Sequence, residues 1–340
     1  MNLYIFGAGA SKASQDGLND AKNIPPLVNE LFDKQYYPYA KLIHLPKENL
    51  ESYKHSMNSQ PLEKWLTNWW EGIKDINEPL VKSAEKTDFG KLTFYIWWVL
   101  QNISNSYTTN NLYRKFLIKL KSRKESPKII TFNYDTLLDK ALNEVFGAMF
   151  HGTLDTYTKQ NYIKAHGSVN WFLEKRNGEI IIGPEMGSSR RVRFDIASSQ
   201  MFNGSELSIE NIHVIEPSHK DLMNFDFISH HRFHNDYFYP VILLPLTSKL
   251  YTFFTYFNER VISEGKKPIS LANDIYMIGY SAQDEIITKE FLPNAPKGTK
   301  LHVIALKDAN EIMDKVLEKN KNLIKGLTYY NGFSDFIEQF

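Results

Sequence analysis

The amino-acid sequence predicts an α/β protein built on a mainly parallel, doubly wound, Rossmann-like sheet. Short strand, polar turn and helix recur along the chain. The strand at residues 275–278 is almost entirely apolar, which is typical of strands buried on both faces. A glycine-rich turn follows the first strand. No internal repeat or low-complexity tract interrupts this order, so we expect one domain over residues 1–340, with a helical excursion at about 60–125 and an insertion at about 174–240.

Composition narrows the class of protein. A chain of 340 residues with 42% apolar residues can bury a large core. Its 40 Lys and Arg against 39 Asp and Glu give a net charge of +1, which predicts no binding to nucleic acid or to an anionic membrane. The sequence has no cysteine, which excludes disulfides and cysteine-ligated zinc. With no signal peptide and no apolar run near the ~20 residues of a membrane span, we expect a cytoplasmic protein.

The first element is a strand at residues 3–6 that enters a turn of small residues. Small side chains let the backbone approach a ligand, and the free amides of a helix start can hold phosphate. Lys12 stands where the full dinucleotide fingerprint has a third glycine, so a simple tight turn remains the alternative. The residues of the turn are Gly7, Ala8, Gly9, Ala10 and Ser11.

A helix is expected to begin at the Pro25-Pro26 pair and to run to Phe32, and further helices are expected in the excursion. Apolar side chains recur there at spacings of three and four, as on one face of a helix. We interpret them as a helical layer and an oligomer surface, with a fully buried stripe as the alternative. They are Leu62, Trp65, Leu66, Trp69, Tyr95, Trp98, Val99 and Ile103.

The central motif is a strand at residues 129–132 followed by Asn133, Asp135 and a helix at 136–145. Alternate residues point the same way, and the carboxyl ends of strands are where ligands bind in open α/β sheets. We therefore expect Asn133 and Asp135 to face one ligand. Alternatively, either side chain only caps the helix.

A histidine lies at the end of the next predicted strand. His166 follows the apolar and aromatic residues from 162 and precedes Gly167, which frees the backbone. A single histidine is commonly structural. Its place at a strand end, soon after the Asn133 turn, indicates a functional residue.

Residues 174–240 read as a lid or small subdomain, because glycines break them into short polar pieces. Further strands are expected at 241–244, at 275–278 and, as the last strand, at 301–304, with helices at 252–263 and from 285. Three histidines of the insertion, His230, His231 and His234, lack the spacing of a known zinc motif. We expect no metal.

Four motifs in order resemble the sirtuin family, and more closely the sirtuin-like NAD hydrolases of bacterial antiviral defence systems. They are residues 7–11, 131–135, 166–168 and 279–281. The resemblance implies NAD bound at the carboxyl edge of the sheet, with the turn at 7–11 on the pyrophosphate. It implies that Asn133 holds the nicotinamide ribose and a water, Asp135 the carboxamide, and that His166 is the base. Gly279 and Ser281 would complete the cofactor contacts, Ser281 on the adenosine half.

Two departures from the sirtuin pattern count against acyl-lysine substrates. Deacylating sirtuins carry a four-cysteine zinc ribbon, whereas this chain has no cysteine. The arginine that sirtuins place after the first helix is also missing, because residues 24–28 read Ile-Pro-Pro-Leu-Val. Plain cleavage of the glycosidic bond suits the residues that remain, since an oxocarbenium-like transition state needs dipoles and a general base rather than a strong acid.

The resemblance therefore implies an NAD glycohydrolase that releases nicotinamide and ADP-ribose and depletes NAD in an antiviral, abortive-infection response. The alternatives are an ADP-ribosyl transferase and a non-catalytic sensor of NAD or ADP-ribose. Because NAD hydrolysis must be restrained in its own cell, we expect a homo-oligomer and a separately encoded sensor or ATPase partner.

Overall fold

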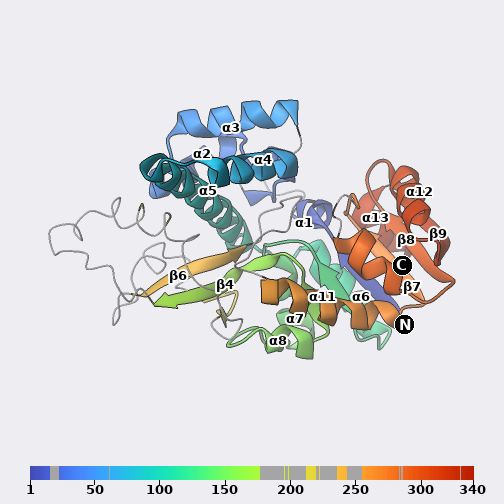
Figure 1. Cartoon of the computed structure of the whole chain (residues 1–340). Coiled ribbons are helices and arrows are strands. Elements are labelled where there is room, and N and C mark those ends of the chain that lie inside the picture. Colours follow the sequence, from blue (N-terminus) through green and yellow to red (C-terminus); the bar gives the residue numbers. More distant parts are fainter. Residues whose placement is uncertain are drawn as a thin grey trace.

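A computed structural model gives the fold (Figure 1). It describes residues 1–15, 23–60, 62–176, 195, 198, 212–219, 222, 236–242, 255–282, 284, 286–329 and 331–340. Six parallel strands form the main sheet, in the order β3-β2-β1-β7-β8-β9. Their bounds are β1 Asn2–Phe6, β2 Ile129–Thr131, β3 Tyr162–Lys164, β7 Asp274–Ile278, β8 Thr299–Ile304 and β9 Leu323–Tyr329. The predicted doubly wound parallel sheet is confirmed.

The strand order reverses between β1 and β7. The chain moves outward from β1 through β2 to β3, and then returns to the other side of β1 to build β7, β8 and β9. In chain order this is the 3-2-1-4-5-6 arrangement of dinucleotide-binding folds, and ligands bind at the carboxyl ends of the strands beside the reversal. The turns after β1 and β7 therefore border the expected ligand crevice.

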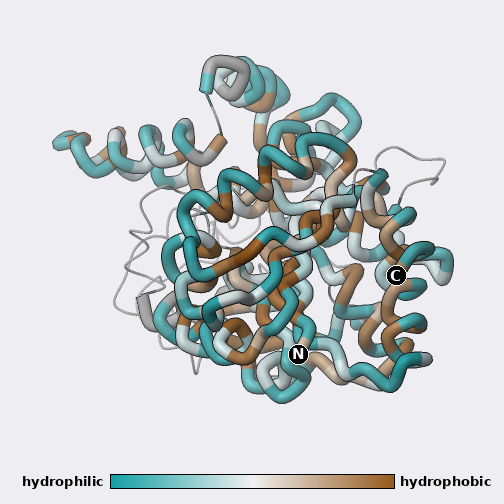
Figure 2. The backbone as a smooth tube through the Cα atoms, turned by 90° about the vertical axis from the view of Figure 1, so that its right-hand side faces the viewer, coloured by the Kyte–Doolittle hydropathy of each residue, from teal (hydrophilic) through white to brown (hydrophobic). Residues whose placement is uncertain are grey.

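Aromatic side chains pack helices against the sheet. Phe6 of β1 contacts the rings of Tyr113, Phe116 and Phe333 at 5.2, 5.9 and 5.8 Å between centroids. These rings belong to α6 (Leu112–Ser122) and α13 (Gly332–Gln339), which lie close together. Figure 2 shows the hydrophobic segments gathered inside this part of the molecule and the hydrophilic ones around it. Other elements around the main sheet are α1 Ala8–Ser14, α7 Leu137–Phe146, α8 Asp155–Lys159, α11 Thr255–Ser270, η8 Ile286–Phe291, η9 Leu292–Asn294 and α12 Ala309–Lys319.

A second, antiparallel sheet has the order β5-β4-β6. Its strands are β4 Gly167–Arg176, β5 Ile212–Val214 and β6 Asp236–Ile242. The expected strand at 241–244 therefore does not continue the main sheet; it is the end of β6, and residues 243–244 lie outside the described part. Residues 174–176, 212–214 and 236–240 of the predicted insertion form strands of this small sheet, and His230, His231 and His234 lie outside the described residues.

The helical excursion begins earlier than predicted. Its elements are η2 Val28–Glu30, η3 Lys34–Tyr36, α2 Tyr37–Ala40, η4 Lys41–Ile43, α3 Lys47–Ser59, α4 Leu62–Asp75 and α5 Pro79–Asn105. The prediction of a helix from Pro25-Pro26 is wrong: residues 25–27 are not helical, and only the three-residue 3-10 turn η2 follows them. Figure 1 shows α2 to α5 grouped beside β4 and β6.

The aromatic stripes belong to the core. Leu66, Val99 and Ile103 are fully buried, and Trp98 is 6% exposed. Helix α5 packs on β4, where the Trp97 indole donates to the Val169 carbonyl at 2.8 Å. The alternative of a buried stripe therefore fits most of these residues, whereas Trp65 and Trp69 are half-buried, and the expected oligomer stays a prediction.

A further strand was missed. The sequence expectation ended the sheet at residues 301–304, but β9 follows α12 and pairs with β8. Most of its side chains are exposed or half-buried, as at the edge of a sheet, so it has no apolar run. Among the residues that the structure describes, no helix is long and apolar enough to cross a membrane.

Candidate functional site at the carboxyl edge of the sheet

The turns after β1 and β7 lie in direct contact. The amide of Gly7 donates to the Ile278 carbonyl at 3.0 Å, and that of Gly9 donates to the Gly279 carbonyl at 2.9 Å. A Cβ on Gly7 would stand 2.6 Å from the Gly279 oxygen, and one on Gly9 would stand 2.9 Å from it. Gly279 has φ +60°, and a Cβ there would lie 2.1 Å from the Ala10 nitrogen. These glycines therefore serve first to bring the two turns together at the strand-order reversal.

Asn133 and Asp135 meet at one serine of α1. The Asn133 amide nitrogen donates to Ser11 Oγ and to the Gly7 carbonyl, both at 2.9 Å. Ser11 Oγ donates in turn to Asp135 Oδ2 at 2.7 Å. The Tyr113 hydroxyl lies 2.9 Å from Ser11 Oγ and 3.2 Å from the Asn133 nitrogen. The two side chains therefore face the same place, as expected, but protein atoms already occupy part of it.

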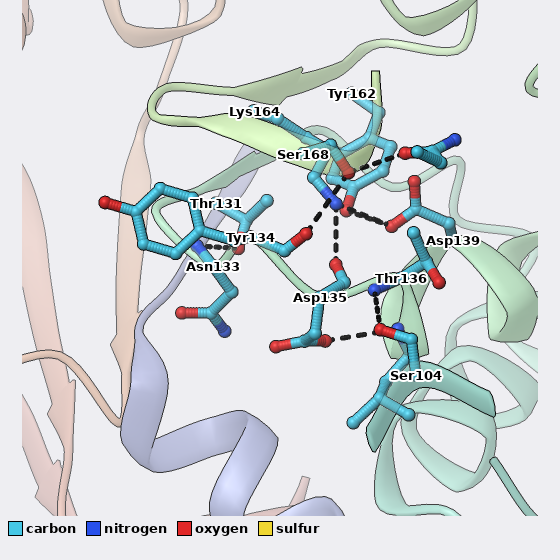
Figure 3. Close-up of polar contacts among 12 residues, drawn as sticks. Ser104, Thr131, Asn133, Tyr134, Asp135, Thr136, Asp139, Tyr162, Lys164 and Ser168 are labelled. Carbon is cyan, nitrogen blue, oxygen red and sulfur yellow. Dashed lines mark hydrogen bonds and ion pairs between the residues drawn. The ribbon is translucent and has the colours of Figure 1, made fainter. Parts of the chain in front are cut away.

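These bonds fix the Asn133 amide in one orientation. Its nitrogen points at α1, so its oxygen points away from α1 (Figure 3). An amide oxygen can accept a hydrogen bond from a hydroxyl or a water. Asn133 can therefore position such a group without adding a charge.

Asp135 also holds the start of α7. Its Oδ1 accepts from the Leu137 amide at 3.1 Å, so the capping interpretation is correct as far as it goes. Burial raises the pKa of the Asp135 carboxyl above its ordinary value. The Lys164 ammonium and the bonds from Ser11 and Leu137 offset part of this rise. Burial also raises the pKa of Tyr113 well above its ordinary value, so its hydroxyl stays protonated and can donate.

Beside this turn lies a buried ion pair that sequence reasoning did not identify (Figure 3). Lys164, the last residue of β3, donates to Asp139 Oδ2 at 3.0 Å and to the main-chain oxygen of Asp135 at 2.6 Å. Both side chains of the pair are fully buried. The hydroxyls of Tyr157 and Tyr162 donate to the same carboxylate. This network ties the end of β3 to the turn that carries Asn133.

His166 stands two residues beyond that lysine. Its ring lies 5.0 Å from the Phe132 ring and 5.8 Å from the Tyr134 ring, the residues on either side of Asn133. Phe132 contacts Tyr280 of the β7 turn at 4.7 Å. His166 therefore belongs to the same carboxyl edge, held by aromatic rings from the β2 turn.

An aspartate from the far side of the reversal reaches this histidine. Asp284 Oδ2 lies 2.5 Å from His166 Nε2, and the two side chains are 14% and 12% exposed. The sequence shows Asp284 at the end of the turn that begins at Gly279, but its partner follows only from the order of the strands. Ser281, in the same turn, is exposed.

The signals that could have found the missed residues differ. Lys164 is a charged residue inside a buried strand, which requires a buried acid nearby. Asp284 carries no such local signal. Among the described residues no group of three or more His, Asp or Glu side chains could hold a metal ion.

Comparisons with known proteins give structural likeness only. No protein-family model matches the chain, and no curated protein matches it. One solved structure, a Sir2 mutant with a p53 peptide and NAD, is 13% identical, with 100% of this chain and 91% of that chain covered and a TM-score of 0.43. An ADP-ribose complex of a Sir2 homologue is 12% identical, with 99% and 89% covered and a TM-score of 0.45. A Sir2 homologue–NAD complex is 11% identical, with 99% and 86% covered and a TM-score of 0.41. At TM-scores below 0.5 these likenesses assign no activity to this chain.

Proposed function

We propose that the protein is an NAD glycohydrolase. The observation that carries the proposal is the meeting of Asn133, Ser11, Asp135 and His166 at the carboxyl edge, beside the reversal of a 3-2-1-4-5-6 sheet. That crevice is where such folds bind dinucleotides. The motif resemblance to sirtuin-like NAD hydrolases names the same residues.

In the proposed reaction, the bond between ribose C1′ and the nicotinamide nitrogen breaks, and its electron pair leaves with neutral nicotinamide. A water oxygen then bonds to C1′, and His166 takes the proton that this water loses. The Asn133 oxygen orients the water or the ribose hydroxyls. Dipoles placed where positive charge develops lower the barrier without a strong acid.

Fewer protein groups are left to contact the carboxamide and the pyrophosphate of NAD than the sequence suggests. Both oxygens of Asp135 already accept a bond, so a contact with the carboxamide would use their remaining lone pairs. The amides of Gly7, Gly9 and Ala10 donate to protein carbonyls, which leaves fewer amides for a pyrophosphate. We retain Ala8, Ser11, Gly279 and Ser281 as the lining of the dinucleotide site.

The test is release of free nicotinamide from NAD by the purified protein. We expect Asn133→Ala and His166→Ala each to lower turnover at least ~100-fold, the usual scale for removing a general base or a positioning group. Asn110→Ala and His151→Ala are matched controls, because both side chains are exposed. Near-normal turnover in either site variant would exclude this site. Label transferred from NAD to protein, with no free ADP-ribose, would instead identify a transferase.

A role in antiviral defence remains a prediction of the resemblance. Homo-oligomerisation and control by a separate sensor or ATPase remain predictions from the need to restrain NAD hydrolysis. The buried side chains of α5 give no support to an interface on that helix, whereas Trp65 and Trp69 of α4 are half-buried. Sedimentation of the lone protein, with NAD turnover measured across concentrations, tests this part. A monomer with rapid, concentration-independent turnover would contradict it.

A further inference from the structure

A carboxylate and an imidazole contact each other although they follow two strands that are not neighbours in the sheet. His166 follows β3, whereas Asp284 follows β7, and β2 and β1 stand between those strands. Even so, Asp284 Oδ2 lies 2.5 Å from His166 Nε2. Both side chains are mostly buried, so water competes little for this contact.

We propose that Asp284 is the positioning residue of His166 and selects its tautomer. A carboxylate accepts hydrogen bonds, so the pair places the proton of the neutral imidazole on Nε2. Nδ1 then carries the free lone pair and is the atom that takes a proton from water. This inference rests on the proposed function, because it names the basic atom of the same site.

The competing interpretation is that Asp284 only caps the helix that follows. Its Oδ1 accepts from the Ile286 amide at 2.7 Å, at the start of η8. Because each carboxylate oxygen has its own partner, one substitution can separate the two roles.

Asp284→Asn keeps the cap and reverses the contact with His166. Asparagine caps helices as well as aspartate does, so its oxygen can still accept from Ile286. Its NH2 group then faces Nε2, which must become an acceptor, and the imidazole proton moves to Nδ1. Turning the amide around would place NH2 against the Ile286 N–H and lose the cap. The same exchange beside a catalytic histidine costs a serine protease about 10⁴-fold in kcat through the wrong tautomer.

The experiment reads the tautomer directly. Imidazole ¹⁵N NMR of the labelled full chain distinguishes a protonated from an unprotonated ring nitrogen, and the His166→Ala spectrum identifies the His166 signals among those of the 10 histidines. We expect the proton on Nε2 in the wild type and on Nδ1 in Asp284→Asn. We also expect kcat for NAD cleavage to fall between ~10² and ~10⁴-fold with a smaller change in KM.

Asp274→Asn is the matched control. Asp274 begins the same strand, β7, and its Oδ1 lies 2.9 Å from His302 Nε2. The Leu327 amide donates to His302 Nδ1 at 3.0 Å, so the backbone already holds the proton of that ring on Nε2. We expect this variant to leave both the His302 tautomer and NAD turnover unchanged.

The outcomes separate the two proposals. A wild-type His166 protonated on Nδ1 overturns the tautomer proposal without any variant, as does an unchanged tautomer in Asp284→Asn. Faster turnover in Asp284→Asn also overturns it, because the aspartate would then be competing with substrate. A wild type that shows the Nε2 tautomer and its reversal, but cleaves no NAD, supports the positioning role and refutes the proposed function.

Discussion

Removing the Asp139 carboxylate should destabilise the protein more than any loss of an exposed ion pair. Asp139 accepts from Lys164 at 3.0 Å and from the hydroxyls of Tyr157 and Tyr162 at 2.6 and 3.0 Å. Burial raises the pKa of both tyrosines well above their ordinary value, so both hydroxyls remain donors. In Asp139→Ala three buried donors lose an acceptor, and the ammonium of Lys164 loses its ion-pair partner while its bond to the Asp135 carbonyl remains.

The cost follows from that uncompensated charge. Removing one partner of a buried pair costs about 3–5 kcal/mol, whereas replacing both partners by apolar residues is far less costly. We therefore expect Asp139→Ala and Lys164→Met each to lower the free energy of unfolding by at least ~3 kcal/mol. The Asp139→Ala/Lys164→Met double variant should lose less than the sum of these two losses by about 2–3 kcal/mol.

Urea denaturation of the single and double variants measures these losses. The control is Lys74→Met, which breaks a pair with Glu71 at 2.9 Å whose side chains are 41% and 43% exposed; we expect a loss of at most about 1 kcal/mol. A loss for Asp139→Ala no larger than this control, or strict additivity in the double variant, would refute the reasoning. The pair would then be better hydrated than its burial indicates.

Three further predictions concern other parts of the edge. Asp135→Asn should weaken binding of NAD more than of ADP-ribose, which lacks the carboxamide; equal losses by calorimetry would make Asp135 a structural cap. Gly279→Ala should destabilise the fold beyond the ~1–2 kcal/mol of a left-handed alanine, because its Cβ meets the Ala10 nitrogen. Gly298→Ala, with φ +88° and nothing within 4 Å of its Cβ, should show the conformational cost alone, and equal melting temperatures would contradict the clash. Burial lowers the pKa of Lys140 from 10.5 to about 8, so the unfolded chain holds more protons between these values. Wild-type stability relative to Lys140→Met should therefore rise with pH from 8 toward 10.5, and a flat difference in urea denaturation would exclude the shift.

Strands buried on both faces could be recognised from the chain alone. They are mostly apolar, so the expected strands at 3–6, 129–132, 275–278 and 301–304 agree with β1, β2, β7 and β8 within two residues at each end. The edge strand β9 could not be recognised, because its side chains face water and carry no such pattern. The aromatic stripes of α4 and α5 have the same spacing in a core as on an interface, so only the packing of α5 against β4 decides between the two.

Part of the site could likewise be predicted from local sequence, and part could not. Asn133, Asp135 and His166 are polar residues at strand ends, and their position follows from local sequence because a turn places them beyond the last buried residue. Their partners do not follow. Ser11 meets Asn133 and Asp135 only because β1 and β2 are adjacent, and Asp284 meets His166 across two intervening strands. The order of strands depends on long-range pairing and on the packing of the turns, which no local pattern encodes, so the tertiary structure alone determined which side chain completes each contact.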